Sequence, residues 1–234
     1  MNTVQSIEAD AAQTKNFRFY DVVSVCFVAI YLISQVASTK LFAFGPFQFP
    51  GAIIVFPISY IFGDILCEVY GYSKTRRIIW LGFISATVMA LVFLAVQALP
   101  PAAMWPHQEA YEKILGFVPR VVLGSIGAFW CGEFANSFVM AKLKVITQGK
   151  HLWARTIGST VIGQAVDSAV FVVIAFSGLM PASVILSVTV SLYVAKVAYE
   201  VIATPITYII VNRLKRAEGV DVFDKGTNFT PFKF

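Results

Sequence analysis

The stretch PGAIIVFPISYIFGDILCEVYGY, residues 50–72, decides how this chain is read. It is mostly apolar and aromatic, yet it carries two carboxylates, Asp64 and Glu68, four residues apart and therefore on one face of a helix. A helix needs about 20 mainly apolar residues to cross a bilayer. A charged group near the middle of such a span costs about 2.5–3.5 kcal/mol, so its presence indicates a functional role. The stretch predicts a membrane helix that carries polar chemistry.

The whole chain has the composition of a membrane protein. Of its 234 residues, 58% are hydrophobic and 13% are charged, whereas soluble domains typically carry about 45–50% and about 25%. These values exclude a soluble enzyme, a nucleic-acid-binding protein and a disordered chain. The three cysteines are odd in number and form no C-x-x-C pair, so we expect small apolar side chains rather than a disulfide framework or a zinc site.

Six stretches are long and apolar enough to cross a membrane, which predicts an all-α membrane protein built as a bundle of six transmembrane helices. The expected spans are residues 19–39, 51–71, 78–99, 119–142, 156–180 and 184–211. The chain then divides into a polar N-terminus (1–18), a membrane domain (19–211) and a polar tail (212–234). Residues 1–16 lack the basic start and apolar core of a cleavable signal peptide, so the first span is expected to act as the membrane signal.

The distribution of Lys and Arg predicts the orientation, because cytoplasmic loops are enriched in these residues. Fourteen of the eighteen fall on one side: Lys15, Arg18, Lys74, Arg76, Arg77, Lys142, Lys144, Lys150, Arg155, Arg213, Lys215, Arg216, Lys225 and Lys233. Three fall on the other side: Lys40, Lys113 and Arg120. With an even number of spans, both termini are expected in the cytoplasm. The longest connection, 100–118, lies outside, either as a short surface helix or as a plain connector.

Six ionisable residues fall inside the predicted spans: Asp64, Glu68, Glu133, Asp167, Lys196 and Glu200. Lys196 can pair with Glu200 four residues on. Glu68 lies closer to the cytoplasm, where either a ligand role or an ion pair with Lys74 or Arg76 is open. The other three acids have no visible partner, so we expect them to be protonated, to face water or to bind a ligand rich in hydrogen-bond donors.

The helical spacing collects these groups on the inner faces of several spans. The polar positions are Gln35 on the first span, Tyr60, Asp64 and Glu68 on the second, Glu133 and Asn136 on the fourth, Gln164 and Asp167 on the fifth, and Tyr193, Lys196 and Glu200 on the sixth. Four helices thus aim polar groups at mid-depth, where transporters keep their substrate sites. The alternative is a set of structural ion pairs inside the bundle.

Helix breakers lie near the same positions. Pro57 and Pro205 each remove a backbone donor and can turn a carbonyl toward a cavity, and Gly51 begins the second span with N–H groups that can meet a polar ligand. A stripe of small residues on the fourth span is typical of close helix packing, in a homodimer or within the bundle. The stripe consists of Gly124, Ala128 and Gly132.

Several segments resemble the queuosine-precursor transporter family, formerly grouped as vitamin-uptake transporters. They are PGAIIVFPISYIFGDILCEVYGY (50–72), GEFANSFVMAKLK (132–144), GQAVDS (163–168), KVAYEVIATP (196–205) and the tail FDKGTNFTPF (223–232). The resemblance runs from about residue 20 to the C-terminus. One departure is Gln35 in ISQVASTK, where the family pattern has an asparagine; both are amides, so the same substrate class is expected.

The resemblance implies a compact six-helix bundle similar to the substrate-binding subunits of energy-coupling-factor vitamin transporters. It implies an inner-membrane importer of 7-cyano-7-deazaguanine or its 7-aminomethyl analogue, with membrane lipid as its surroundings and no nucleic acid as partner. The family's site positions fall on Asp64, Glu68, Glu133, Asn136, Gln164, Asp167, Lys196 and Glu200.

The chemistry of these residues suits such a ligand. A carboxylate accepts the adjacent N–H and NH₂ of a deazaguanine as a fork, and Lys196, Asn136 or Gln164 can donate to the ring carbonyl. An aromatic side chain, with Tyr60, Phe56 and Trp130 as candidates, would stack on the ring. An unpaired acid would couple substrate to a proton, with Asp167 or Glu133 as the hypothesis.

Three alternatives stay open at this stage. The chain has no Walker A pattern, so it is either a secondary transporter or a substrate-binding subunit that needs a separate ATPase. An intramembrane enzyme would use Asp64 and Glu68 as an acid pair or as metal ligands, but H-E-x-x-H and G-x-S-x-G are absent. A structural subunit would leave the buried acids unexplained. We expect no catalytic residue, metal or cofactor.

Overall fold

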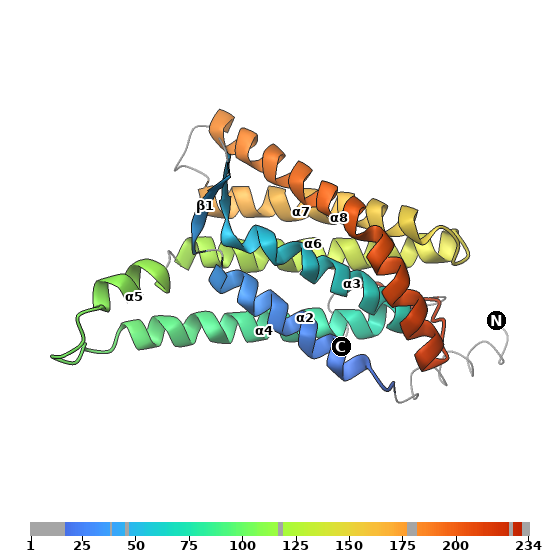
Figure 1. Cartoon of the computed structure of the whole chain (residues 1–234), viewed down its shortest axis with the longest axis horizontal. Coiled ribbons are helices and arrows are strands. Elements are labelled where there is room, and N and C mark those ends of the chain that lie inside the picture. The colour runs from blue at the N-terminus through green and yellow to red at the C-terminus, as the bar shows by residue number, and fades with distance from the viewer. Residues whose placement is uncertain are drawn as a thin grey trace.

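The computed structural model describes residues 17–37, 39–44, 47–116, 119–176, 182–224 and 227–230. Most of these residues are helical, and the long helices run beside one another along the molecule (Figure 1). In chain order the helices are α2 (Tyr20–Ala37), α3 (Phe56–Tyr70), α4 (Tyr72–Gln97), α5 (Gln108–Ile114), α6 (Pro119–Ile146), α7 (Leu152–Phe176) and α8 (Ala182–Glu218). The described part of the chain is therefore all-α, apart from one short hairpin.

Every predicted span contains a helix, and three of these helices are long and apolar enough to cross a membrane: α2, α4 and the part of α8 from Leu192 to Glu218. Large apolar side chains such as Val25, Leu91 and Ile202 are 60–77% exposed on them, as lipid contact requires. The helices α4 and α8 extend beyond the predicted spans, because hydropathy detects the edge of the hydrocarbon and not the end of the helix. The connection 100–118 contains the short helix α5.

The short helix α3 lies at the centre of the bundle and packs against α2, α4, α6 and α8. All residues from Gly63 to Tyr70 are buried. Its 15 residues span about 22 Å. Because α3 is enclosed on all sides, its two carboxylates must find partners or ligands inside the protein.

The chain enters α3 through a hairpin of β1 (Leu41–Phe44) and β2 (Phe47–Pro50), followed by the 3₁₀ turn η1 (Gly51–Ile54). The prediction of free N–H groups at Gly51 is wrong for its own amide, which donates to the Lys40 carbonyl at 2.7 Å. Pro57 lies in the first turn of α3, where its missing N–H costs no helical hydrogen bond. Pro205 lies inside α8.

The helices α6 and α7 form an antiparallel pair with an extensive interface. At Gly163 an added Cβ would lie only 2.8 Å from Asn136 Cβ and 3.0 Å from the Gly132 carbonyl oxygen, so the two backbones approach closely. Ala128, in the middle of the small-residue stripe, is also buried. The stripe therefore serves packing inside the bundle, and a homodimer stays a prediction.

Candidate functional site

The structure buries six of the predicted polar residues inside the bundle, and hydrogen bonds or charge interactions link five of them, all except Gln164. Each is at most 5% exposed, although each has a carboxyl or amide group whose burial without a partner is costly. They are Asp64 on α3, Glu133 and Asn136 on α6, Gln164 and Asp167 on α7, and Glu200 on α8. Charge interactions link Glu133 to Asp167 and Glu200, and link Asp64 to the same Glu200. We call these six residues the acid cluster.

Asp64 connects three helices within the acid cluster. Its Oδ1 accepts a hydrogen bond of 2.8 Å from Asn136 Nδ2 on α6. Its carboxyl group also lies within hydrogen-bonding reach of the Glu200 carboxyl group on α8. Two carboxyl groups in this arrangement can share one proton. Asn136 itself is held against α7, because Gly163 leaves no Cβ in its way.

Glu133 is a buried acid whose carboxylate is available to accept hydrogen bonds from a ligand. It is fully buried, and neither of its carboxylate oxygens has a hydrogen-bond partner among the described residues. The carboxylate lies against the backbone of α3, since a Cβ added to Gly63 would lie 2.0 Å from Glu133 Oε1. Leaving both oxygens of a buried carboxylate unpaired is costly, so this arrangement fits a site that a ligand completes.

Lys196 forms an ion pair that the sequence spacing did not predict. Its Nζ donates to Asp167 Oδ2 at 2.9 Å, from α8 to α7. The expectation that Asp167 has no basic partner is therefore wrong, because Lys196 reaches it from the neighbouring helix. Packing of α7 against α8 decides the partner, whereas an i, i+4 count considers only one helix.

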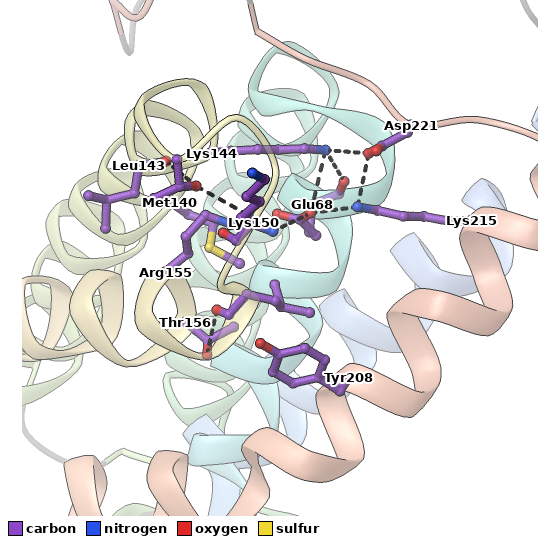
Figure 2. A network of polar contacts seen from close by, with 12 residues as sticks. Glu68, Met140, Leu143, Lys144, Lys150, Arg155, Thr156, Tyr208, Lys215 and Asp221 are labelled. Atoms are coloured by element: carbon purple, nitrogen blue, oxygen red, sulfur yellow. Dashed lines mark hydrogen bonds and ion pairs between the residues drawn. The ribbon is translucent and has the colours of Figure 1, made fainter.

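Glu68 lies one helical turn from Asp64 and belongs to a different set of contacts. Its Oε1 accepts 2.7 Å from Arg155 and 2.6 Å from Lys215, and Figure 2 shows these side chains converging on it. The expected pairing with Lys74 or Arg76 is wrong. Those two residues bind elsewhere: Lys74 lies over the rings of Phe17 and Tyr20, and Arg76 donates to carbonyls of the C-terminal tail.

The remaining predicted site residues lie on α2, α3 and α6. Gln35 is half-buried near the end of α2. Tyr60 belongs to α3, but its side chain, like that of Phe56, lies outside the described residues. Trp130 packs edge-on against Trp80 and Phe134, with ring centroids 5.5 and 5.4 Å apart. Its proposed stacking on a ligand stays a prediction.

Tyr31 on α2 is a candidate that the sequence reasoning missed. It is fully buried and stacks on Phe129, with ring centroids 3.7 Å apart. Its hydroxyl has no hydrogen-bond partner among the described residues, and it interacts electrostatically with Asp167 and Glu133. The sequence could have indicated Tyr31, because it lies four residues before Gln35 and therefore on the same face of the helix.

Comparison with known proteins decides the kind of protein that carries this cluster. The model of a family described as "Putative vitamin uptake transporter" matches residues 50–210, which include the whole acid cluster. The chain belongs to this family. Membership in a transporter family agrees with the three helices, in the described part of the chain, that are long and apolar enough to cross a membrane.

Two relatives in this transporter family carry more specific names. The chain is 36% identical to the "Probable queuosine precursor transporter" of Bacillus subtilis (strain 168) over 146 residues, 62% of this chain and 64% of that protein. It is 26% identical to the "Queuosine precursor transporter" of Escherichia coli (strain K12) over 121 residues, 52% of each. The matches thus span about half to two thirds of each relative. No solved structure matches the chain significantly.

Proposed function

We propose that this family member imports queuosine precursors, 7-cyano-7-deazaguanine or its 7-aminomethyl analogue, across the inner membrane as a secondary transporter. The names of both relatives support this substrate class. The observation that carries the proposal is Glu133 in the acid cluster, a fully buried carboxylate whose two oxygens have no hydrogen-bond partner among the described residues.

The two oxygens of Glu133 suit the donor edge of a deazaguanine. That edge presents an N–H and an exocyclic NH₂ side by side, and a carboxylate accepts both as a fork. Charge-assisted hydrogen bonds of this kind contribute about 1.5–3 kcal/mol each, more when the site is desolvated. The Oδ1 of Asn136 and the Oε1 of Gln164, which accept no hydrogen bond within the described ranges, add acceptors for the remaining N–H groups.

The ring carbonyl of the ligand needs a hydrogen-bond donor. Lys196 is engaged by Asp167, and the Asn136 amide by Asp64. The Tyr31 hydroxyl is buried and unpartnered within the described part of the chain. Tyr31 is therefore our preferred donor, and it adds to the site residues expected from the sequence.

The carboxyl pair of Asp64 and Glu200 supports a proton as the coupling ion. One proton held between two buried carboxyl groups can leave when the helices α3 and α8 separate. This moves the proposed coupling site away from Asp167, whose partner is Lys196. Uptake into proteoliposomes that a protonophore leaves unchanged would rule out this mechanism.

The test uses the purified protein alone. Its melting temperature is measured with 7-cyano-7-deazaguanine, the aminomethyl analogue, guanine and an unrelated vitamin, since a ligand that binds only the folded state raises it. Uptake of the radiolabelled deazaguanine into liposomes follows. A shift with the deazaguanines together with uptake supports a secondary transporter. A shift without uptake favours a binding subunit that needs an ATPase partner, and no shift with any purine refutes the substrate class.

Glu133→Gln is the informative variant, because it replaces one acceptor oxygen with a donor of the same shape. We expect binding to weaken about 10–100-fold. The matched control is Glu109→Gln on α5, where the side chain is 79% exposed and forms an ion pair with Lys113. Equal weakening in both variants would contradict the role of Glu133.

A further inference from the structure

Glu68 is a fully buried acid surrounded by three cations from different helices. Arg155 and Lys215 bind its Oε1 directly, and Lys144 Nζ lies 3.5 Å from the same oxygen. Lys144 also donates to the Glu68 carbonyl at 2.7 Å. These contacts tie together the ends of α3, α6, α7 and α8.

The C-terminal tail completes this arrangement. Asp221 bridges Lys144 and Lys215 at 3.0 and 2.9 Å, as Figure 2 shows, and Lys144 donates to the Val222 carbonyl at 2.5 Å. Burial tends to raise the pKa of Asp221, but hydrogen bonds from the two lysines outweigh it and hold this pKa below its ordinary value. The tail therefore contributes an acid that binds Lys144 and Lys215.

Further along, the tail closes over the start of α4. The Tyr72 N–H donates to both carboxylate oxygens of Asp224 at 3.1 Å. Arg76 donates to the carbonyls of Asn228 and Thr230 at 2.8 and 2.6 Å. The tail thus joins helix ends that belong to different parts of the chain.

The charge balance explains why the tail matters. Without Asp221, Glu68 is the carboxylate that contacts the three cations directly, with Asp224 acting on Lys144 from further away. The mutual repulsion of the cations in a poorly solvated place then favours separation of the helix ends. Asp221 adds a second negative charge in direct contact with Lys144 and Lys215. A contact between the tail and the bundle can therefore control whether this end of the bundle stays closed.

We propose that Glu68, its three cations and Asp221 form the inner gate of the transport path, and that the tail latches this gate shut. The gate presupposes the proposed transport function and the orientation predicted by the basic residues, which puts it on the cytoplasmic side. Glu68 lies four residues, about 6 Å, from Asp64 along α3. A ligand released from the acid cluster toward the cytoplasm passes this level, so the ion pairs must separate and Glu68 acts as a gate residue rather than a ligand.

Cys67 is a natural reporter of gate opening. It is 2% exposed, and its Sγ donates to the Ser137 carbonyl at 3.3 Å. In a Cys26→Ser/Cys131→Ser background it is the remaining thiol. Its reaction with a membrane-impermeant maleimide is followed in inside-out vesicles, first in this parent and then with Asp221→Lys added. No substrate is needed.

We expect Asp221→Lys to speed Cys67 labelling at least about fivefold over the parent, because charge reversal removes the attraction and adds repulsion. The matched control, Glu109→Lys on α5, reverses an exposed acid far from the gate and should leave labelling unchanged. If Asp221→Lys does not assemble, Asp221→Asn makes the same comparison with a smaller increase. A lower melting temperature with unchanged labelling would overturn the gate and leave a purely structural clamp.

The gate and the proposed substrate can fail separately. Labelling that depends on Asp221, in a protein that no deazaguanine stabilises, would retain the gate and refute the substrate. Deazaguanine binding and uptake with labelling indifferent to Asp221 would do the reverse.

Discussion

Gly63→Ala should displace the carboxylate of Glu133 without unfolding the protein. The added Cβ would lie 2.0 Å from Glu133 Oε1 and 3.0 Å from Cδ, whereas ordinary contact begins at 3.4 Å. The oxygen must therefore move about 1.4 Å, the difference between 3.4 and 2.0 Å. Overpacking costs about 1–3 kcal/mol, and the better helix propensity of Ala returns about 1 kcal/mol. The clashing atom ends a flexible side chain, so we expect the fold to survive.

Binding should suffer more than stability. A displacement of about 1 Å at a reacting group can cost about 100-fold, and we expect a similar loss for a two-point carboxylate contact. At a ligand concentration 100 times the wild-type Kd, binding stabilises the wild type by about 2.7 kcal/mol. A variant that binds 100-fold more weakly would gain only about 0.4 kcal/mol under the same conditions. Thermal melting with and without 7-cyano-7-deazaguanine measures this difference.

Two further variants sharpen the comparison. In Gly127→Ala, on α6 like Glu133, the new Cβ meets Ile174 Cδ1 at an ordinary 3.4 Å, so binding should be unchanged. In Gly63→Ala/Glu133→Asp the shorter acid withdraws by about 1.5 Å and relieves the clash. Wild-type ligand stabilisation in Gly63→Ala would refute the claim that Glu133 binds the ligand from its position against α3.

Other predictions concern ion pairs and the tail. Lys196→Met leaves the buried Asp167 unpaired and should cost about 3 kcal/mol, which the double variant with Asp167→Asn largely restores in thermal melting. Asp224→Ala removes the acceptor at the start of α4 and should cost about 1 kcal/mol without weakening deazaguanine binding; a loss of binding would contradict a purely local role. The melting-temperature advantage of the wild type over Asp221→Asn should be full above pH 3.8 and vanish as the pH falls below it. The direction follows because hydrogen bonds from Lys144 and Lys215 lower the pKa of Asp221 in the folded state, so its stabilising charge is lost as the pH falls. Glu68 is the other acid that Lys144 contacts. An advantage that persists at low pH would contradict this reasoning.

Hydropathy alone predicted a helix within each of the six spans and selected the residues worth examining, although three of the described helices are long and apolar enough to cross a membrane. In a bilayer each helix satisfies its own backbone hydrogen bonds, so its existence depends on local sequence. An acid inside an apolar span is costly wherever it lies, so Asp64, Glu133 and Asp167 stood out before any fold was known. The same reasoning found the residues of the acid cluster.

The partners of these residues depend on how the helices pack. Counting along one helix paired Lys196 with Glu200, and only the register of α7 against α8 shows its ion pair with Asp167. Three cations from distant parts of the chain meet Glu68 only after α6, α7 and α8 pack around α3. Glu133 reaches the backbone of α3 because a glycine faces it. Interhelical contacts are set by side-chain volumes on two helices at once, and a pattern read along one helix does not contain that information.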